Sequence, residues 1–258
     1  MQVRLSLLLR TWRWRFGSRV DRTPPTLPTG AALNGTMKAL LVNCTLKQGN
    51  DLSNTQALLD IVGHELKSQG AEVEHIRLVN HNILPGTASQ MGPDDEWPPV
   101  LEKVKQADIL ILGTPIWLGQ IGSIAQRFIE RMDALFHEEA LWDKQTGQFY
   151  PYNKVAGVVV TGSVDGAQAV SRYVLWTFSE MGFTIPPNST CFWVGNVDEE
   201  GDFLTTGGLQ SVYARKTALW LANNAVNLSR VLTANPYPTS LNQLAEQAKA
   251  AANAAKPA

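Results

Sequence analysis

The sequence predicts an α/β fold: a three-layer sandwich in which helices cover both faces of a five-stranded parallel sheet. Short apolar segments alternate with amphipathic helix patterns from Met37 onward, the order expected of a parallel sheet. Two of these segments, 108–113 and 155–161, are apolar almost throughout, as strands buried on both faces are. The 258 residues are enough for one such domain with tails.

The strands follow from short apolar runs bounded by turn residues, and the helices from apolar side chains repeating every three to four positions. We expect strands at 38–43, 72–79, 108–113, 155–161 and 190–194. We expect helices at 55–69, 97–106, 123–136, 168–181 and 208–225.

The helix boundaries carry their own signals. Ser53 or Asn54 is placed to cap the first helix, and Gly70 to end it. Pro98 and Pro99 fall in the first turn of the second helix, where proline is tolerated. In the first helix the side chains on one face are Leu58, Ile61, Val62 and Leu66.

Both ends of the chain differ in composition from the part between them. Residues 1–36 hold six Arg and one Asp, a net charge of +5, which leaves −6 for the rest of a chain whose total is −1. We expect 1–36 to be a basic, disordered extension; a transit-like segment and a basic membrane-surface arm are alternatives. Residues 37–234 form the predicted domain, and 235–258 a Pro-rich and then Ala-rich tail.

Composition excludes several classes of function. The acidic domain offers no basic face for a nucleic acid. No apolar run reaches the roughly 18 residues of a membrane span. The two cysteines, Cys44 and Cys191, are too few for a disulfide scaffold and have no metal-site spacing. We therefore expect a cytoplasmic protein without a metal, a membrane span or a nucleic-acid partner.

The loop after the first strand, 44–54, predicts an anion site. It joins a buried strand to a helix start, where unpaired N–H groups and the positive end of the helix dipole favour a phosphate. A helix cap with no ligand is the plainer reading of its Ser-Asn-Thr cluster. Its candidate ligands are Thr45, Lys47, Ser53, Asn54 and Thr55.

Two further loops leave the ends of the third and fourth strands. The first reads Thr114 to Gly122 and offers a flat aromatic side chain, and the second reads Thr161 to Gly166 and is small and polar. Together with the anion site they suggest a ligand with a phosphate at one end and a flat ring at the other. The chain has no G-K-[ST] motif, no G-x-G-x-x-G motif and no G-x-S-x-G motif, which disfavours a P-loop, a Rossmann dinucleotide site and a serine hydrolase.

At these loops the sequence resembles the flavodoxin-like NAD(P)H-dependent FMN reductases, which include NAD(P)H:quinone reductases. Ser53-Asn54-Thr55 resembles the end of the family's G-S-P-R-x-x-S-N-T loop, with 44–47 (CTLK) in place of G-S-P-R. Thr114 to Trp117 resembles T-P-[IV]-[YW], and Thr161 to Gly166 resembles T-G-x-x-[DG]-G. The resemblance covers about 37–227 and implies the strand order 2-1-3-4-5.

The resemblance assigns roles to the three loops. The first loop's candidates would hold the FMN phosphate. The second would flank the isoalloxazine through Pro115, Ile116, Trp117, Leu118 and Gly119. The third would contact the other edge of the ring through Thr161, Gly162, Ser163 and Asp165.

The function that this implies is an FMN-dependent oxidoreductase that passes hydride from NAD(P)H through the flavin to a quinone or flavin acceptor. The alternatives are a non-enzymatic electron carrier of flavodoxin type and a flavin-free binding protein on the same fold. By resemblance we expect a homodimer or homotetramer, and a lid or contact role for 138–153. We read Cys44 as packed at a strand end, Trp176 as core, and Trp193 as core or subunit interface.

Overall fold

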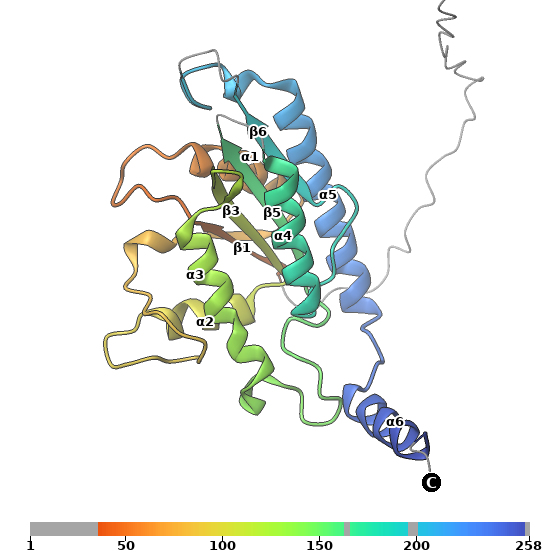
Figure 1. The fold of residues 1–258 in the computed structure, drawn as a ribbon. Coiled ribbons are helices and arrows are strands. Elements are labelled where there is room, and N and C mark those ends of the chain that lie inside the picture. The colour runs from red at the N-terminus through yellow and green to blue at the C-terminus, as the bar shows by residue number, and fades with distance from the viewer. Residues whose placement is uncertain (1–35, 163–165, 196–200, 256–258) are drawn as a thin grey trace, which may run out of the picture. The chain divides into compact units, whose positions relative to one another are not determined.

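The computed structural model describes residues 36–162, 166–195 and 201–255, and its centre is a twisted parallel sheet (Figure 1). The strand order β2-β1-β3-β5-β6 confirms the predicted order, with β5 and β6 as the fourth and fifth parallel strands. The five strands are β1 (Lys38–Asn43), β2 (Glu72–Arg77), β3 (Ile109–Trp117), β5 (Val155–Gly162) and β6 (Thr190–Val194). A two-residue strand, β4 (Gln120–Ile121), pairs antiparallel with the end of β3.

Helices cover both faces of the sheet, which makes the predicted three layers. One face carries α1 (Asn54–Ser68) and α5 (Val212–Ala234). The other carries α2 (Trp97–Gln106), α3 (Ser123–Met132) and α4 (Ala167–Glu180). A further helix, α6 (Leu241–Ala254), lies in the C-terminal tail and buries none of its residues.

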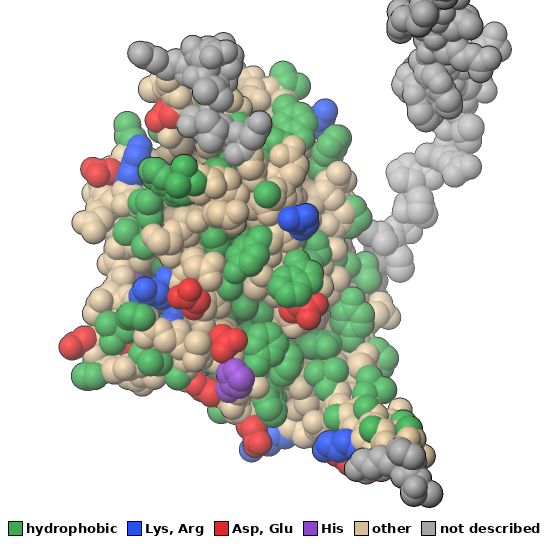
Figure 2. Space-filling view, viewed as in Figure 1, with side chains coloured by type: hydrophobic (Ala, Val, Ile, Leu, Met, Phe, Trp, Pro, Cys, Tyr) green, Lys and Arg blue, Asp and Glu red, His purple; other side chains and the backbone are tan. Residues whose placement is uncertain are grey.

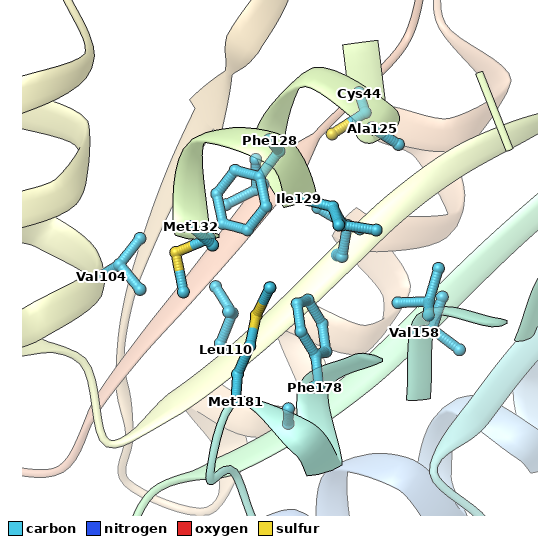
Figure 3. Close-up of a cluster of buried hydrophobic side chains, with 14 of the residues drawn as sticks. Cys44, Val104, Leu110, Ala125, Phe128, Ile129, Met132, Val158, Phe178 and Met181 are labelled. Atoms are coloured by element: carbon cyan, nitrogen blue, oxygen red, sulfur yellow. The ribbon is translucent and has the colours of Figure 1, made fainter. Parts of the chain in front are cut away.

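Alternate strand residues supply two separate cores. In β1, Leu40 and Val42 face the α2–α4 layer, whereas Ala39 and Leu41 face the α1–α5 layer. Because successive side chains point to opposite faces, a strand buried on both sides reads as apolar throughout. Figure 3 shows part of the first core, with Phe128 and Met132 of α3 beside Leu110 of β3.

The structure extends several predicted elements. β3 continues to Trp117, because Pro115 pairs with Thr161 of β5 and the strand end folds back onto β4. The last helix starts at Val212 after a 3-10 turn and runs to Ala234, well beyond the predicted 225. Its sequence contains neither Gly nor Pro, so nothing local ends it sooner. The predicted helix 123–136 becomes α3 followed by the 3-10 turn Asp133–Phe136.

A buried ion pair orders the long connection 81–96. The guanidinium of Arg131 donates to both carboxylate oxygens of Asp95 at 2.8 and 3.0 Å, and both side chains are fully buried. The same guanidinium donates to the backbone carbonyls of Leu84 and Ala88. This connection is therefore fixed to α3 although it has no regular secondary structure.

The structure contradicts two expectations. Trp176 was expected in the core, but it is 62% exposed on α4, on a face where Figure 2 shows hydrophobic side chains among acidic ones. The expected lid, 138–153, lies at the amino end of β5, since Gln148 donates to the carbonyls of Tyr237 and Thr239 beyond α5. The flavin loops were predicted at the opposite, carboxyl end, so this segment is no lid for them within the chain; its contact role stays a prediction.

Candidate functional site

A pocket of about 380 Å³ opens at the carboxyl edge of the sheet, where β1, β3, β5 and β6 end. Such edges are the usual ligand sites of open parallel sheets. The size lies within the range that holds small ligands. The residues around it are Thr45, Leu46, Lys47, Asn54, Thr55, Pro115, Ile116, Trp117, Leu118, Thr161, Gly162, Trp193, Asp202 and Phe203.

The first turn of α1 forms one wall of the pocket. Ser53 is its N-cap, and the Ser53 hydroxyl accepts the N–H of Gln56 at 3.1 Å. The N–H groups of Asn54 and Thr55 lie in the first turn of α1 and have no acceptor within the helix. The helix dipole is also positive at this end. This wall of the pocket therefore suits an anion.

Asn43, at the end of β1, links that strand to the start of α1. Its side-chain oxygen accepts the N–H of Thr45 at 3.0 Å, and its amide nitrogen donates to Gln56 at 2.9 Å and to Ser53 at 3.4 Å. The side chain is fully buried. Sequence reasoning placed Asn43 at the end of the first strand and gave it no role. An amide side chain at a strand end, just before a capped helix, was the available signal.

A hydroxyl pair joins the anion wall to the end of β5. The Oγ1 atoms of Thr55 and Thr161 lie 2.8 Å apart, and both residues are buried. Each hydroxyl has a single proton, so whichever one donates, the other keeps its proton for a second acceptor. The pair therefore holds α1 against β5 and leaves one donor available at the pocket.

The β3–β4 hairpin supplies an apolar rim. Trp117 is 54% exposed and Leu118 98% exposed, and the turn places Leu118 at φ 48° and Gly119 at φ 76°. A positive φ is uncommon for leucine and costs about 1–2 kcal/mol. A ligand or partner bound at the pocket would cover this exposed apolar side chain.

Gly162 allows the end of β5 to pack closely against β3. A Cβ atom at this position would lie 2.7 Å from Cδ1 and 3.0 Å from Cβ of Ile116. Both residues line the pocket. Because Gly162 has no side chain, this part of the pocket wall is flat. A flat ring would fit against such a wall.

A segment beyond β6, residues 202–204, reaches the pocket together with Trp193 of β6, and this was not predicted. Trp193 and Phe203 contact each other with ring centroids 5.5 Å apart. The N–H of Leu204 donates to the side-chain oxygen of Asn54 at 3.2 Å, which ties this segment to α1. No local signal reveals a contact between residues 150 positions apart, and Trp193 was assigned to the core or an interface.

Asp202 brings a negative charge to the same wall. The side-chain amide of Asn54 donates to its carboxylate and lowers the pKa of Asp202, and hydrogen bonds from Thr205 and Leu204 lower it further. Asp202 is therefore ionised at neutral pH, on a wall otherwise suited to an anion. Asp202 and Lys47, which carry opposite charges, both line the pocket.

The structure brings most of the predicted residues to this one pocket. Ser53 is a buried helix cap outside the lining, and Gly119 forms the hairpin turn. Ser163 and Asp165 lie outside the described residues. The predicted residues that line the pocket are Thr45, Lys47, Asn54, Thr55, Pro115, Ile116, Trp117, Leu118, Thr161 and Gly162.

Other chemistries find little support. Burial raises the pKa of Cys44, whose thiol is fully enclosed, so this residue packs as expected and is not a ready nucleophile. Within 36–162, 166–195 and 201–255, no group of His, Cys, Asp and Glu side chains is arranged to hold a metal ion. None of the helices in these ranges is long and apolar enough to cross a membrane.

Comparisons with known proteins identify the family of the chain. The profile of a family described as NADPH-dependent FMN reductase matches residues 37–197. The chain is 32% identical over 222 residues to 8-demethyl-8-aminoriboflavin-5'-phosphate synthase of Streptomyces davaonensis, covering 83% of this chain and 85% of that protein. A crystal structure of RosB with bound 8-demethyl-8-formylriboflavin-5'-phosphate matches at TM-score 0.76 and 32% identity, covering 83% of this chain and 87% of that one.

One similar protein carries a different kind of name. A protein of Mycobacterium bovis called divalent metal cation transporter MntH is 30% identical over 217 residues, which cover 80% of this chain but 31% of that protein. The transporter name describes that longer protein. The matched family region begins at β1 and ends just past β6, and so includes the strand ends that form the pocket. The chain belongs to the NADPH-dependent FMN reductase family, a family of flavoprotein oxidoreductases with the flavodoxin-like fold.

Proposed function

We propose that the pocket binds FMN and that the protein is an NAD(P)H-dependent reductase. The observation that carries the proposal is the joining of two unlike walls in one cavity: the unpaired N–H groups of α1, and the flat apolar wall of the hairpin and Gly162. A phosphate suits the first and a tricyclic ring the second. FMN has both groups in one molecule.

The residues present fit this cofactor. Asn54, Thr55 and the hydroxyl of Thr45 would hold the phosphate, with Lys47 as the nearby positive charge. The Thr45 hydroxyl accepts the N–H of Lys47 at 3.3 Å and so keeps its own proton for the phosphate. One hydroxyl of the Thr55–Thr161 pair would donate its free proton to the part of FMN that lies between the phosphate and the ring.

The hairpin and the end of β5 would orient the ring. Pro115, Ile116, Trp117 and Gly162 would form the flat wall against which the ring lies. When bound, FMN supplies the redox chemistry, taking hydride from NAD(P)H and passing electrons to a quinone or flavin acceptor. The chain's own part is to hold the ring in place and to leave one face open, which the exposed Trp117 and Leu118 make possible.

Steady-state assays test the proposal. The FMN-loaded protein should oxidise NADPH or NADH when a quinone or free flavin is supplied, and initial rates with the two nucleotides will show which is preferred. Absence of turnover on a protein that still binds FMN would favour the electron-carrier alternative. Absence of FMN binding would support the flavin-free alternative and contradict the proposal.

A second candidate is an enzyme for which the flavin phosphate is the reactant. It is favoured by the similarity, at 32% identity, to the aminoriboflavin phosphate synthase and to RosB bound to a formyl derivative of riboflavin phosphate. Mass spectrometry of the flavin after incubation separates the two functions. A reductase returns FMN with unchanged mass, whereas a flavin-modifying enzyme alters it.

The family resemblance also carries the proposal that the protein is a homodimer or homotetramer. The exposed apolar rim, with Leu118 at 98% exposure, is what a second subunit near the flavin site would cover. Light scattering of the purified chain tests this. A monomer at micromolar concentration would contradict it.

A further inference from the structure

The loop between β1 and α1 wraps around a single guanidinium. Arg77, the last residue of β2, pairs in register with Asn43, the last residue of β1, so its side chain emerges beside the loop. It donates to the carbonyls of three loop residues: Lys47 through Nε at 3.1 Å, Gly49 through Nη1 at 2.8 Å, and Asp51 through Nη2 at 2.7 Å. Each nitrogen of the fork has its own acceptor in the loop.

Asn80 supports the same loop from the same strand end. Its side-chain oxygen accepts the N–H of Gly49 at 2.8 Å, and its amide nitrogen donates to the Gly49 carbonyl at 3.4 Å. Gly49 sits at φ 57°, so the loop turns sharply where both side chains hold it. The loop is thus shaped by polar side chains from the end of β2 and from the 3-10 turn Leu78–Asn80 that follows it, and not by burial.

Little else holds this loop. Residues 46–52 are all exposed, and Leu52 is 78% exposed, so apolar packing contributes little to their order. Yet Thr45 and Lys47, which open the loop, line the proposed phosphate wall. A loop that buries no apolar side chains depends on its hydrogen bonds for a defined conformation.

We propose that Arg77 is a positioning residue that fixes the loop 46–52 in the shape that receives the flavin phosphate. The inference rests on the proposed FMN site. The guanidinium does not line the pocket, and its donors are directed at loop carbonyls, so it acts through the loop and not on the ligand. Three donors in a rigid plane suit this task, which an ammonium group on a flexible stem cannot perform.

The proposal predicts an effect confined to the phosphate. If Arg77→Ala leaves the loop in its binding shape one tenth of the time, the apparent Kd for FMN rises about tenfold. Riboflavin has the same ring and ribityl chain but no phosphate, so its Kd should stay within about twofold. The preference for FMN over riboflavin should therefore fall about tenfold.

The experiment is a flavin-fluorescence titration of the full-length chain and its variants with FMN and with riboflavin. Arg77→Lys keeps the charge but cannot reach three carbonyls, and should behave like Arg77→Ala. Arg230→Ala is the matched control, because Arg230 donates to the carbonyl of Gln69 at 3.0 Å at the far end of α1. It should leave both affinities unchanged. Hydrogen exchange should accelerate in 46–52 and not elsewhere.

The outcomes separate the inference from the proposed function. If the unaltered protein binds no FMN, the proposed function fails. If it binds FMN and Arg77→Ala does so equally well, the positioning role is wrong. Equally weakened binding of FMN and riboflavin by Arg77→Ala would also overturn it, because that result indicates a general structural defect. Full FMN affinity in Arg77→Lys would overturn it as well, because it would show that the charge alone matters.

Discussion

Replacement of Thr55 by valine should destabilise the protein through a single atom. The Thr55 and Thr161 hydroxyls lie 2.8 Å apart, and the residues are 2% and 4% exposed. Valine has nearly the same shape as threonine, so Thr55→Val opens no cavity. It leaves the buried Thr161 hydroxyl without its partner.

The expected loss follows from that burial. An unsatisfied buried polar group costs about 1–3 kcal/mol, whereas replacing both partners by apolar groups of the same shape is nearly neutral. Thr55→Val and Thr161→Val should therefore each lower the free energy of unfolding by about 1–3 kcal/mol. The double variant should lose clearly less than the sum of the two.

Urea unfolding of the flavin-free chain, followed by circular dichroism, measures these differences. The dependence of the unfolding free energy on urea should be the same in all variants. Thr233→Val is the control, since Thr233 is exposed and its hydroxyl donates to its own helix; its effect should stay within about 0.5 kcal/mol. Strict additivity of Thr55→Val and Thr161→Val would refute the reasoning.

Three further changes have expected outcomes. Arg131→Met strands the buried Asp95 carboxylate and should lower the free energy of unfolding by about 3–5 kcal/mol in urea titrations. Burial alone would raise the pKa of Asp95, but Arg131 and three backbone N–H groups lower it to about 2. The stabilisation by this pair should therefore be complete above about pH 4 and be lost as the pH falls toward 2. A free energy of unfolding that does not change over this pH range would contradict this. Leu118→Gly relieves the positive φ and should stabilise the flavin-free protein by up to about 1 kcal/mol, and destabilisation in thermal melts would refute the assigned strain. Asp202→Asn removes a negative charge beside the phosphate wall and should tighten FMN binding about threefold to tenfold at low salt, less at high salt, with no gain for riboflavin; weaker FMN binding would show that Asp202 is itself a ligand.

Local pattern was sufficient for most of the sheet. The parallel sheet was expected because apolar segments alternate with helices, whereas its strand order came from the family resemblance. A cap at Ser53 or Asn54 and the end of α1 at Gly70 were readable from residue type. Element ends that depend on pairing partners were not readable. β3 continues to Trp117 because Pro115 meets Thr161 across the sheet, and that partner lies 46 positions away.

The candidate site was likewise predicted only in part. The walls formed by the start of α1 and the end of β3 lie close in sequence to predicted strands, and they were predicted. Asp202 and Phe203 were missed because they reach the pocket through the chain beyond β6, where residue type gives no sign of what they face. Arg77 was missed because its three acceptors are backbone carbonyls, which every residue has.

The most direct test of the account is a titration of the full-length chain with FMN and with riboflavin, followed by flavin fluorescence. We predict saturation at one FMN per chain. Charge-assisted hydrogen bonds to the phosphate contribute about 1.5–3 kcal/mol, so FMN should bind at least about tenfold more tightly than riboflavin. Equal affinity for the two flavins would contradict the phosphate wall at α1, and no change in fluorescence with either would contradict the flavin site.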